Sequence, residues 1–490
     1  MSWLIKKSNL THSSLIKNSS WGIFSNILQT VFVSLFFVIV ARKYQPSVFA
    51  EFLISTTVYQ VVAAFSSMGL GQWFIREYAT EENKIDFTGR FLKTQTALGV
   101  IFYIINIALA YLVYPDGQIK LLCIILGTNI IFDNLINAIK SLNIAEFQQK
   151  KTASILVMDG FLKLLVGCLL FVQPFSAIIL SILMIVVRIV TVGLFLKLGT
   201  SNSINFGLIW RVQVSLSDLK QLIIKNWQFI IIGSISIIYW RIANIIISKA
   251  LTLTDVADYE IAFRIFYIVQ VLPIIASATV YPQFIKYFNA GNFTALKSLY
   301  KNLFLIYSVV SFVSYAFIFS FAHLIVPLGF GNSYPGATLC LQQMFLTYLV
   351  LPTVLLQANI IVAMGLEKMD MWCNIVSLVA NVAACFIGLY FLRSLTTINY
   401  SIFFSFIVFH ALQDWVLLKK GITSISHVLK YYGALAVFIV GYAYVSQQAN
   451  AYLVFGGFIV ALMLVSFALL FSDGSKSFIN QYKSFNPKKV

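Results

Sequence analysis

The chain has 490 residues, of which 60% are hydrophobic and 10% are charged, and its mean hydropathy is +0.88. Soluble domains are about 45–50% apolar and about 25% charged, so this composition excludes a water-soluble fold. The formal net charge of +17 could indicate a nucleic-acid partner, but the basic residues are scattered singly through the connecting loops. We therefore expect a protein of the lipid bilayer that binds no nucleic acid.

Long apolar segments recur from Trp21 to Phe471, and each approaches the about 20 residues that a membrane-spanning helix needs. They predict an all-α integral membrane fold with about fourteen transmembrane helices. The expected spans are residues 21–41, 49–70, 94–114, 119–139, 155–172, 174–196, 222–247, 258–283, 302–326, 338–363, 371–392, 398–418, 428–446 and 451–471.

Lys and Arg residues are distributed very unevenly between the two sides of this arrangement. The loops and tails on the side of the termini hold about 23 of them, against about 4 in the opposite loops. By the positive-inside rule, both termini are expected in the cytoplasm. The largest loops, near residues 71–93 and 197–221, have roughly 25 residues and are too short for a separate folded domain.

Two short sequence patterns recur at an offset of about 207 residues, near the first and seventh helices and near the second and eighth. Six spans separate the copies, so they share an orientation and predict two lobes related by an axis along the membrane normal. The expected parts are a cytoplasmic N-terminus at 1–20, an N-lobe of six helices at 21–196, a cytoplasmic loop at 197–221, a C-lobe of six helices at 222–418, two C-terminal helices at 428–471 and a cytoplasmic tail at 472–490.

Ionisable side chains inside a bilayer cost at least about 2.5 to 3.5 kcal/mol and usually face a cavity or a partner. Four deep basic residues indicate a cationic cavity suited to an anionic passenger: Lys163, Arg188, Arg241 and Arg264. Snorkelling to the nearer interface is the alternative, as is local neutralisation. Asp159 precedes Lys163 by four residues and Glu260 precedes Arg264 by four, so each pair can meet on one helix face.

Arg241 has no acidic residue near it in its own helix, which makes it our first candidate for substrate contact. Arg76 is expected to receive the substrate on the cytoplasmic side. Candidates for binding a coupling cation or proton are Asp133, Asp159, Asp414 and His410, although each could instead be a hydrogen-bonded structural residue. The five cysteines lack metal-ligand spacing, so no metal site and no cofactor are expected.

Several motifs recur in the order typical of one family. The chain resembles the Wzx-type polysaccharide-biosynthesis flippases, which belong with the lipid II flippase and the multidrug and toxin extruders. The residues that carry the resemblance are Ala41-Arg42, Phe49-Ala50-Glu51-Phe52, Gly69-Leu70-Gly71, Ile75-Arg76-Glu77, the run from Val256 to Arg264, Tyr281-Pro282, the run from Phe330 to Tyr334, Gly336-Ala337, and Asn359 through Gly365-Leu366-Glu367.

This resemblance implies twelve core helices plus two, alternating access, and an undecaprenyl-diphosphate-linked oligosaccharide as the passenger. It also implies a bacterial inner membrane and, as partners, the polysaccharide polymerase and chain-length machinery. Relatives usually carry a Gly-rich turn before the twelfth helix, whereas residues 395–405 here lack glycine. The expected boundary between the eleventh and twelfth helices therefore lacks the glycine that would mark it.

Three other functions fit parts of this pattern. A multidrug or metabolite exporter would share the fold, but extruded drugs are commonly cationic and the deep basic residues disfavour them. A membrane-embedded polymerase or glycosyltransferase would resemble its relatives in having a large outer loop, whereas the longest outer loops here have about ten residues. A passive channel would show repeated charge rings along its pore, which are not visible.

Overall fold

The structure is a computed structural model, and it describes residues 12–114, 117–199 and 237–471 together with residues 207, 212–214, 224, 234 and 235. The expected tail at 472–490, most of the loop at 197–221 and the first half of the seventh span lie outside the described residues. Within the described ranges every regular element is a helix, and no strand occurs. The predicted all-α membrane fold is confirmed.

The helices of the first part of the chain are α1 (His12–Lys43), α2 (Pro46–Ser66), α3 (Leu70–Tyr78), α4 (Lys84–Val113), α5 (Gly117–Gly127), α6 (Asn129–Ala145), α7 (Gln149–Val172) and α8 (Ala177–Leu198). Those of the second part are α11 (Leu253–Asn289), α12 (Phe293–Phe330), α13 (Pro335–Tyr348), α14 (Leu351–Ala363), α15 (Glu367–Phe391), α16 (Leu395–Lys419), α17 (Ile425–Gln448) and α18 (Ala451–Phe471). Residues 237–250 are also helical.

Eleven helical segments among the described residues are long and apolar enough to cross a membrane. Three of them contain two helices each, because α2 and α3, α5 and α6, and α13 and α14 follow one another after short breaks. Three further helical segments are apolar, namely α1, residues 237–250 and α18. Together with the eleven, they agree with the about fourteen predicted spans.

The stretch expected to be a loop at residues 71–93 is mostly helical, so that prediction is wrong. Leu70, Phe74 and Tyr78 fall on one side of α3 and are buried, and the Phe74 ring stacks on Phe91 of α4 with the ring centroids 4.2 Å apart. The chain then needs only a short turn, because the side chain of Asn83 accepts a hydrogen bond from the backbone amide of Asp86 and starts α4. Polar residues hid this amphipathic helix from a hydropathy-based prediction.

The boundary between the eleventh and twelfth predicted spans lies where α15 ends at Phe391 and α16 begins at Leu395. No glycine is needed there, since the Ser394 side chain accepts a hydrogen bond from the backbone amide of Thr397 and caps α16. A serine cap thus starts α16 without a glycine turn.

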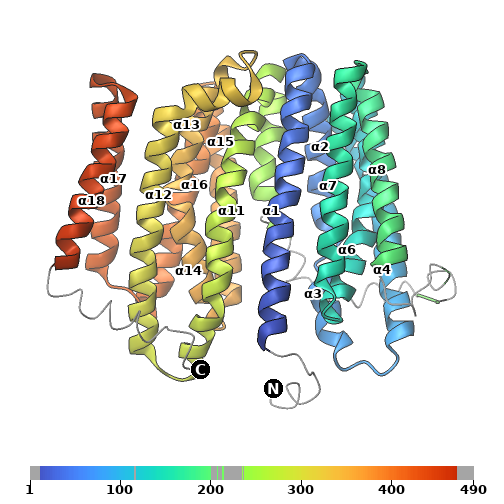
Figure 1. The fold of residues 1–490 in the computed structure, drawn as a ribbon, viewed down its shortest axis with the longest axis horizontal. Helices are drawn as coiled ribbons and strands as arrows, with labels where there is room; N and C mark the ends of the chain where they lie inside the picture. Colours follow the sequence, from blue (N-terminus) through green and yellow to red (C-terminus); the bar gives the residue numbers. More distant parts are fainter. Residues whose placement is uncertain are drawn as a thin grey trace.

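Helices α1 to α8 gather on one side of the molecule and α11 to α16 on the other, with α17 and α18 at the outer edge (Figure 1). Helix α1 packs along α7, α4 packs on α6, α11 packs on α13 and α15 packs on α16. Helix α1 begins and α18 ends toward the lower end of the bundle in Figure 1. This arrangement leaves an interior space between the two groups of helices.

The two groups are joined at the upper end of Figure 1, where α1 and α12 end. Arg42 donates hydrogen bonds to the carbonyl oxygens of Leu328 and Gly329, at the C-terminus of α12, where a cation is favoured. The Tyr334 hydroxyl donates to the carbonyl of Ala41 at 2.6 Å. We call these contacts the upper ties.

A second pair of upper ties connects the end of α4 to the helical residues 237–250. The Lys249 ammonium donates to the carbonyl of Val113, and the hydroxyls of Tyr114 and Ser248 lie 2.5 Å apart. Burial raises the pKa of Tyr114 to about 12, so this hydroxyl keeps its proton at neutral pH. The tie between Tyr114 and Ser248 therefore persists across the physiological pH range.

We expect Gly336→Ala to lower thermal stability, because the backbone amides of Gly336 and Ala337 bind the buried Asp258 carboxylate. A Cβ atom at Gly336 would lie 2.3 Å from Asp258 Oδ2, so the carboxylate must move away from its donors. The expected cost is about 1–3 kcal/mol. Gly441→Ala in α17 is the control, since its Cβ atom would meet nothing within 4 Å. Equal melting temperatures of the two variants in detergent would contradict this interpretation.

Candidate functional site

A central cavity of about 1010 Å³ lies between the two groups of helices. Helices α1, α2, α6, α7 and α8 form one wall, and residues 237–241 with α11, α14 and α16 form the other. Phe36, Phe37 and Phe52 line its upper part, below the upper ties, whereas Ser67 and Lys140 line it near the lower ends of α2 and α6. The cavity therefore extends toward the lower end of the bundle.

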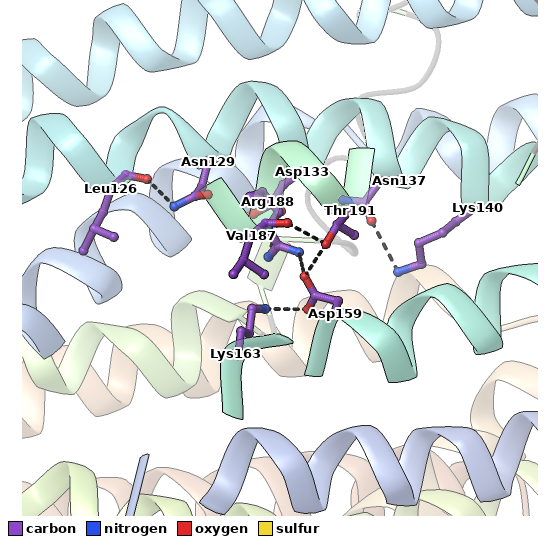
Figure 2. A network of polar contacts seen from close by, with 10 residues as sticks. All are labelled: Leu126, Asn129, Asp133, Asn137, Lys140, Asp159, Lys163, Val187, Arg188 and Thr191. Atoms are coloured by element: carbon purple, nitrogen blue, oxygen red, sulfur yellow. Dashed lines mark hydrogen bonds and ion pairs between the residues drawn. The ribbon is translucent and has the colours of Figure 1, made fainter. Parts of the chain in front are cut away.

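Arg188 of α8 is the centre of an ion-pair network on the first wall (Figure 2). Its guanidinium lies 3.1 Å from Asp133 of α6 and 3.3 Å from Asp159 of α7. Asp159 is fully buried, and it also accepts hydrogen bonds from Lys163 at 2.6 Å and from Thr191 at 2.9 Å. The predicted pair of Asp159 and Lys163 is present, and Arg188 joins it from a neighbouring helix.

Arg241 and Glu260 form the corresponding pair on the second wall, with Arg241 Nη1 and Glu260 Oε1 2.8 Å apart. Asn244 donates to the same carboxylate and to Thr57 of α2 at 3.0 Å, so this cluster also contacts the first group of helices. The expectation that Glu260 pairs with Arg264 on one helix face is wrong. Tertiary packing places Arg241, which lies outside α11, beside the Glu260 carboxylate, whereas Arg264, one turn further along α11, forms no ion pair with it.

Arg264 lines the cavity without an ion pair to any described residue. Its guanidinium carbon lies 3.4 Å from the centre of the Phe37 ring, and its buried Nε has no hydrogen-bond partner in the structure. Contact with an aromatic face stabilises a cation but leaves its N–H donors unsatisfied. Arg264 is therefore the cavity arginine best able to accept a new anionic partner.

Lys140 of α6 is a second cavity cation that forms no ion pair within the described part of the chain. It donates a hydrogen bond to Asn137 Oδ1 at 3.4 Å (Figure 2). The expected span at residues 119–139 ended one residue before Lys140. Asp133, Asn137 and Lys140 nevertheless follow one another at four- and three-residue spacing in α6, and all three line the cavity. This helical periodicity was the signal in the sequence that could have revealed it.

The charges in and beside the cavity do not balance. Five basic side chains line it, namely Lys140, Lys163, Arg188, Arg241 and Arg264. They face three carboxylates, Asp133, Asp159 and Glu260, which leaves a surplus of two positive charges when all groups are ionised. Because the site lies among apolar helices, this surplus is poorly screened by water and attracts anions strongly.

Arg76, the fifth predicted substrate residue, lies outside the cavity. It is exposed on α3, and its guanidinium pairs with the neighbouring Glu77 at 2.9 Å. The other four, Lys163, Arg188, Arg241 and Arg264, line one common cavity.

The four predicted ion-coupling residues fall in two places. Asp133 and Asp159 line the cavity and neutralise Arg188. Asp414 and His410 lie on α16 in a buried network that does not line the cavity. Asp414 accepts hydrogen bonds from Gln357 of α14 at 2.6 Å and from Tyr432 of α17 at 3.3 Å, and His410 Nδ1 lies 2.9 Å from it. No cluster of three or more metal-ligating side chains occurs in the described ranges.

The Arg42→Ala variant tests whether the upper ties keep the cavity closed at that end. We expect a cysteine placed at Thr56, in a chain whose native cysteines are replaced, to react several times faster with an impermeant thiol reagent added at the upper face. The reason is that Arg42 bridges the two groups of helices. Lys43→Ala is the control, because Lys43 lies over the ring of Phe171 of α7, within its own group of helices. The same labelling rate in both variants would refute a closing role for Arg42.

Solved structures of transporters share this fold. A structure described as lipid II flippase MurJ, inward closed conformation, matches with a TM-score of 0.70 at 13% identity, covering 94% of this chain and 99% of that chain. An inward-facing multidrug resistance MATE family transporter matches with a TM-score of 0.67 at 14% identity, covering 81% and 96%. A MATE structure in complex with MaL6 matches with a TM-score of 0.57 at 13% identity, covering 86% and 96%. None of the curated protein sequences matches the chain.

These likenesses and the central cavity define the class: an all-α membrane protein with the fold of the MOP-superfamily transporters. Within it, the chain belongs to the polysaccharide biosynthesis protein family, whose sequence model matches residues 39–339. The resemblance drawn from the sequence motifs is thereby confirmed.

Proposed function

We propose that this protein is a flippase that moves a lipid-linked oligosaccharide from the cytoplasmic to the outer face of a bacterial inner membrane by alternating access. The observation that carries the proposal is the surplus of two positive charges around the central cavity, between helices that are otherwise apolar. A lipid joined to a glycan through a diphosphate carries two ionisable phosphate oxygens. Its charge matches the surplus.

Arginine suits this passenger because its planar guanidinium can form two parallel hydrogen bonds to one phosphate group. Arg264 and Lys140 require no broken ion pair to bind it, whereas Arg188 and Arg241 are held by carboxylates. We infer that Arg264 makes the principal diphosphate contact. The ion-paired arginines then set the potential of the cavity rather than binding the substrate directly.

The family and the fold support the same passenger class. The family takes its name from polysaccharide biosynthesis, and one structure of the same fold is a lipid II flippase. By analogy we propose an undecaprenyl-diphosphate-linked repeat unit of O-antigen or capsule type as the substrate. The polysaccharide polymerase and chain-length machinery would act on the translocated unit and are the proposed partners.

The basic loops and the upper ties support this direction of transport. Positive-inside counting assigns the lower end of Figure 1, where α1 begins, to the cytoplasm. The described conformation then has its cavity directed toward the cytoplasm and its outer end closed by Arg42, Tyr334 and Lys249. We propose that two lobes, at residues 21–196 and 222–418, rock about the cavity to release the glycan outside.

Export of a drug or metabolite is the rival function, since MATE transporters of multidrug resistance share the fold. A cationic drug would enter a cavity that already holds surplus positive charge, which raises its binding free energy. The rival therefore requires an anionic or neutral passenger.

Deletion of the gene, followed by complementation, distinguishes these functions. We expect deletion cells to accumulate lipid-linked oligosaccharide and to lose the corresponding surface glycan, and the wild-type chain to restore both. Export of a cationic dye serves as the parallel measurement. Deletion cells that keep their surface glycan, accumulate no lipid-linked sugar and retain more dye would favour the exporter and contradict the flippase.

A further inference from the structure

A second, smaller cavity opens beside the lower part of the central one. It has a volume of about 230 Å³ and lies between α3, α4 and α6. Ser67, Asn137 and Lys140 line both cavities, so the two adjoin one another at this point. We call the smaller one the side pocket. Drug-sized ligands usually occupy about 300–1000 Å³, so the side pocket has room for one small chemical group.

The walls of the side pocket differ in chemistry from those of the central cavity. Five of the twelve residues that line it carry an amide or a hydroxyl, namely Ser67, Gln72, Gln95, Asn137 and Ser141. Lys140 is the single charged residue among the twelve, and Phe91 adds an aromatic surface. Amides and hydroxyls both donate and accept hydrogen bonds, as sugar hydroxyls do, while the C–H faces of a sugar ring can pack on an aromatic ring. A neutral polyhydroxylated group fits these walls better than a second phosphate does.

Gln95 of α4 provides the second observation. Its side chain is 98% buried, its Nε2 donates to the carbonyl of Ser67 at 3.2 Å, and its Oε1 has no hydrogen-bond partner in the structure. A buried acceptor without a donor is unfavourable, so a ligand hydroxyl that donates to Oε1 would be bound preferentially. Gln95 lines the side pocket but not the central cavity.

The backbone between α2 and α3 forms one wall of the side pocket. Met68 and Gly69 have positive φ angles of 48° and 59°, which turn the chain sharply before α3. A Cβ atom at Gly71 would lie 2.6 Å from Ser141 Oγ, so α3 approaches α6 closely at a residue without a side chain. Gln72, the next residue, also lines the side pocket.

We propose that the side pocket is a sugar-recognition subsite, in which Gln95 and Gln72 bind hydroxyl groups of one sugar ring while the diphosphate occupies the central cavity. The inference rests on the proposed function. It adds that this chain distinguishes one substrate from another by the sugar part. Lys140, at the junction of the two cavities, contacts the region where sugar and diphosphate are joined.

The test compares two probes on the purified chain in lipid nanodiscs: undecaprenyl diphosphate, and the lipid-linked glycan extracted from cells that lack this gene. We expect the wild-type chain to bind the glycan-bearing probe more tightly. Gln95→Leu and the exposed Gln72→Ala should each weaken binding of that probe about three- to tenfold, as expected for one lost hydrogen bond, and leave binding of undecaprenyl diphosphate unchanged. Gln447→Ala, an exposed glutamine of α17 outside both cavities, should change neither.

Other results separate this inference from the proposed function. Equal affinity of the wild-type chain for both probes, or an equal loss for both probes in Gln95→Leu and Gln72→Ala, overturns the sugar subsite alone. In that case Arg264→Gln should still weaken binding of both probes. Failure of the wild-type chain to bind either probe overturns the flippase proposal and the subsite together.

Discussion

Arg264→Gln is expected to lower translocation of lipid-linked glycan about ten- to hundredfold at unchanged protein level. Arg264 is the cavity arginine without an ion pair among the described residues, so its N–H donors are available to a diphosphate. Losing a hydrogen bond to a charged group costs about 1.5–3 kcal/mol, and each 1.4 kcal/mol changes affinity tenfold. The measurement is the rate at which surface glycan reappears when the variant is induced in deletion cells.

The matched control is Arg393→Gln, the same substitution at an exposed arginine that lines neither cavity. It should support surface glycan like the wild-type chain. Glutamine keeps part of the length and polarity of arginine, so a folding defect at position 264 should be small. Full activity of Arg264→Gln would show that the diphosphate is held elsewhere, and the ion-paired Arg188 and Arg241 would then need testing.

Asp159→Ala is expected to destabilise the protein by about 3–5 kcal/mol, because it removes the carboxylate between two cations in an apolar region, leaving Lys163 without its ion pair and Arg188 paired with Asp133 alone. Asp159 is fully buried and accepts from Lys163, Arg188 and Thr191. We expect poor membrane accumulation of the variant and a melting temperature several degrees lower in detergent.

Asp86→Ala is the matched control, since Asp86 also pairs with a basic residue four positions later, Arg90, at 2.9 Å. That pair is exposed, and surface ion pairs contribute about 0–1 kcal/mol. The two variants thus remove the same kind of pair from two environments. Similar melting temperatures would mean that water reaches Asp159 in the membrane-embedded protein and that burial does not determine its role.

Much of the fold could be predicted from the sequence, because the bilayer demands long apolar helices and the chain contains them in order. The amphipathic helix α3 was missed because the prediction relied on long apolar segments. The polar residues Gln72, Arg76 and Glu77 lower the hydropathy of α3. The helix forms because Leu70, Phe74 and Tyr78 pack against α4 and α6, which is tertiary information.

The candidate site could be predicted in part. Contacts within one helix follow from spacing, and the pair of Asp159 and Lys163 formed as expected. Contacts between helices do not follow, so Glu260 pairs with Arg241 instead of Arg264. Asp414 and His410 illustrate a related limit, because helix spacing places them together but cannot tell whether they face a cavity or a packed interface.

Several of the motifs that carried the family resemblance meet at the upper end of the molecule. Ala41 and Arg42 contact the end of α12 and Tyr334, and Asp258 binds the backbone amides of Gly336 and Ala337. These residues are far apart in sequence, but in the structure they lie together where the two groups of helices are joined. Sequence order alone identified the family but not this common location.

The central claim is that the cavity carries a diphosphate-linked glycan across the membrane. Its most direct test reconstitutes the purified chain in liposomes containing extracted lipid-linked glycan and measures how much glycan becomes accessible to an added glycosidase that cannot cross the bilayer. We expect accessibility to rise with the wild-type chain and with Arg393→Gln, and to remain near that of protein-free liposomes with Arg264→Gln. Unchanged accessibility with the wild-type chain, in liposomes where the same protein transports a cationic dye, would contradict the account.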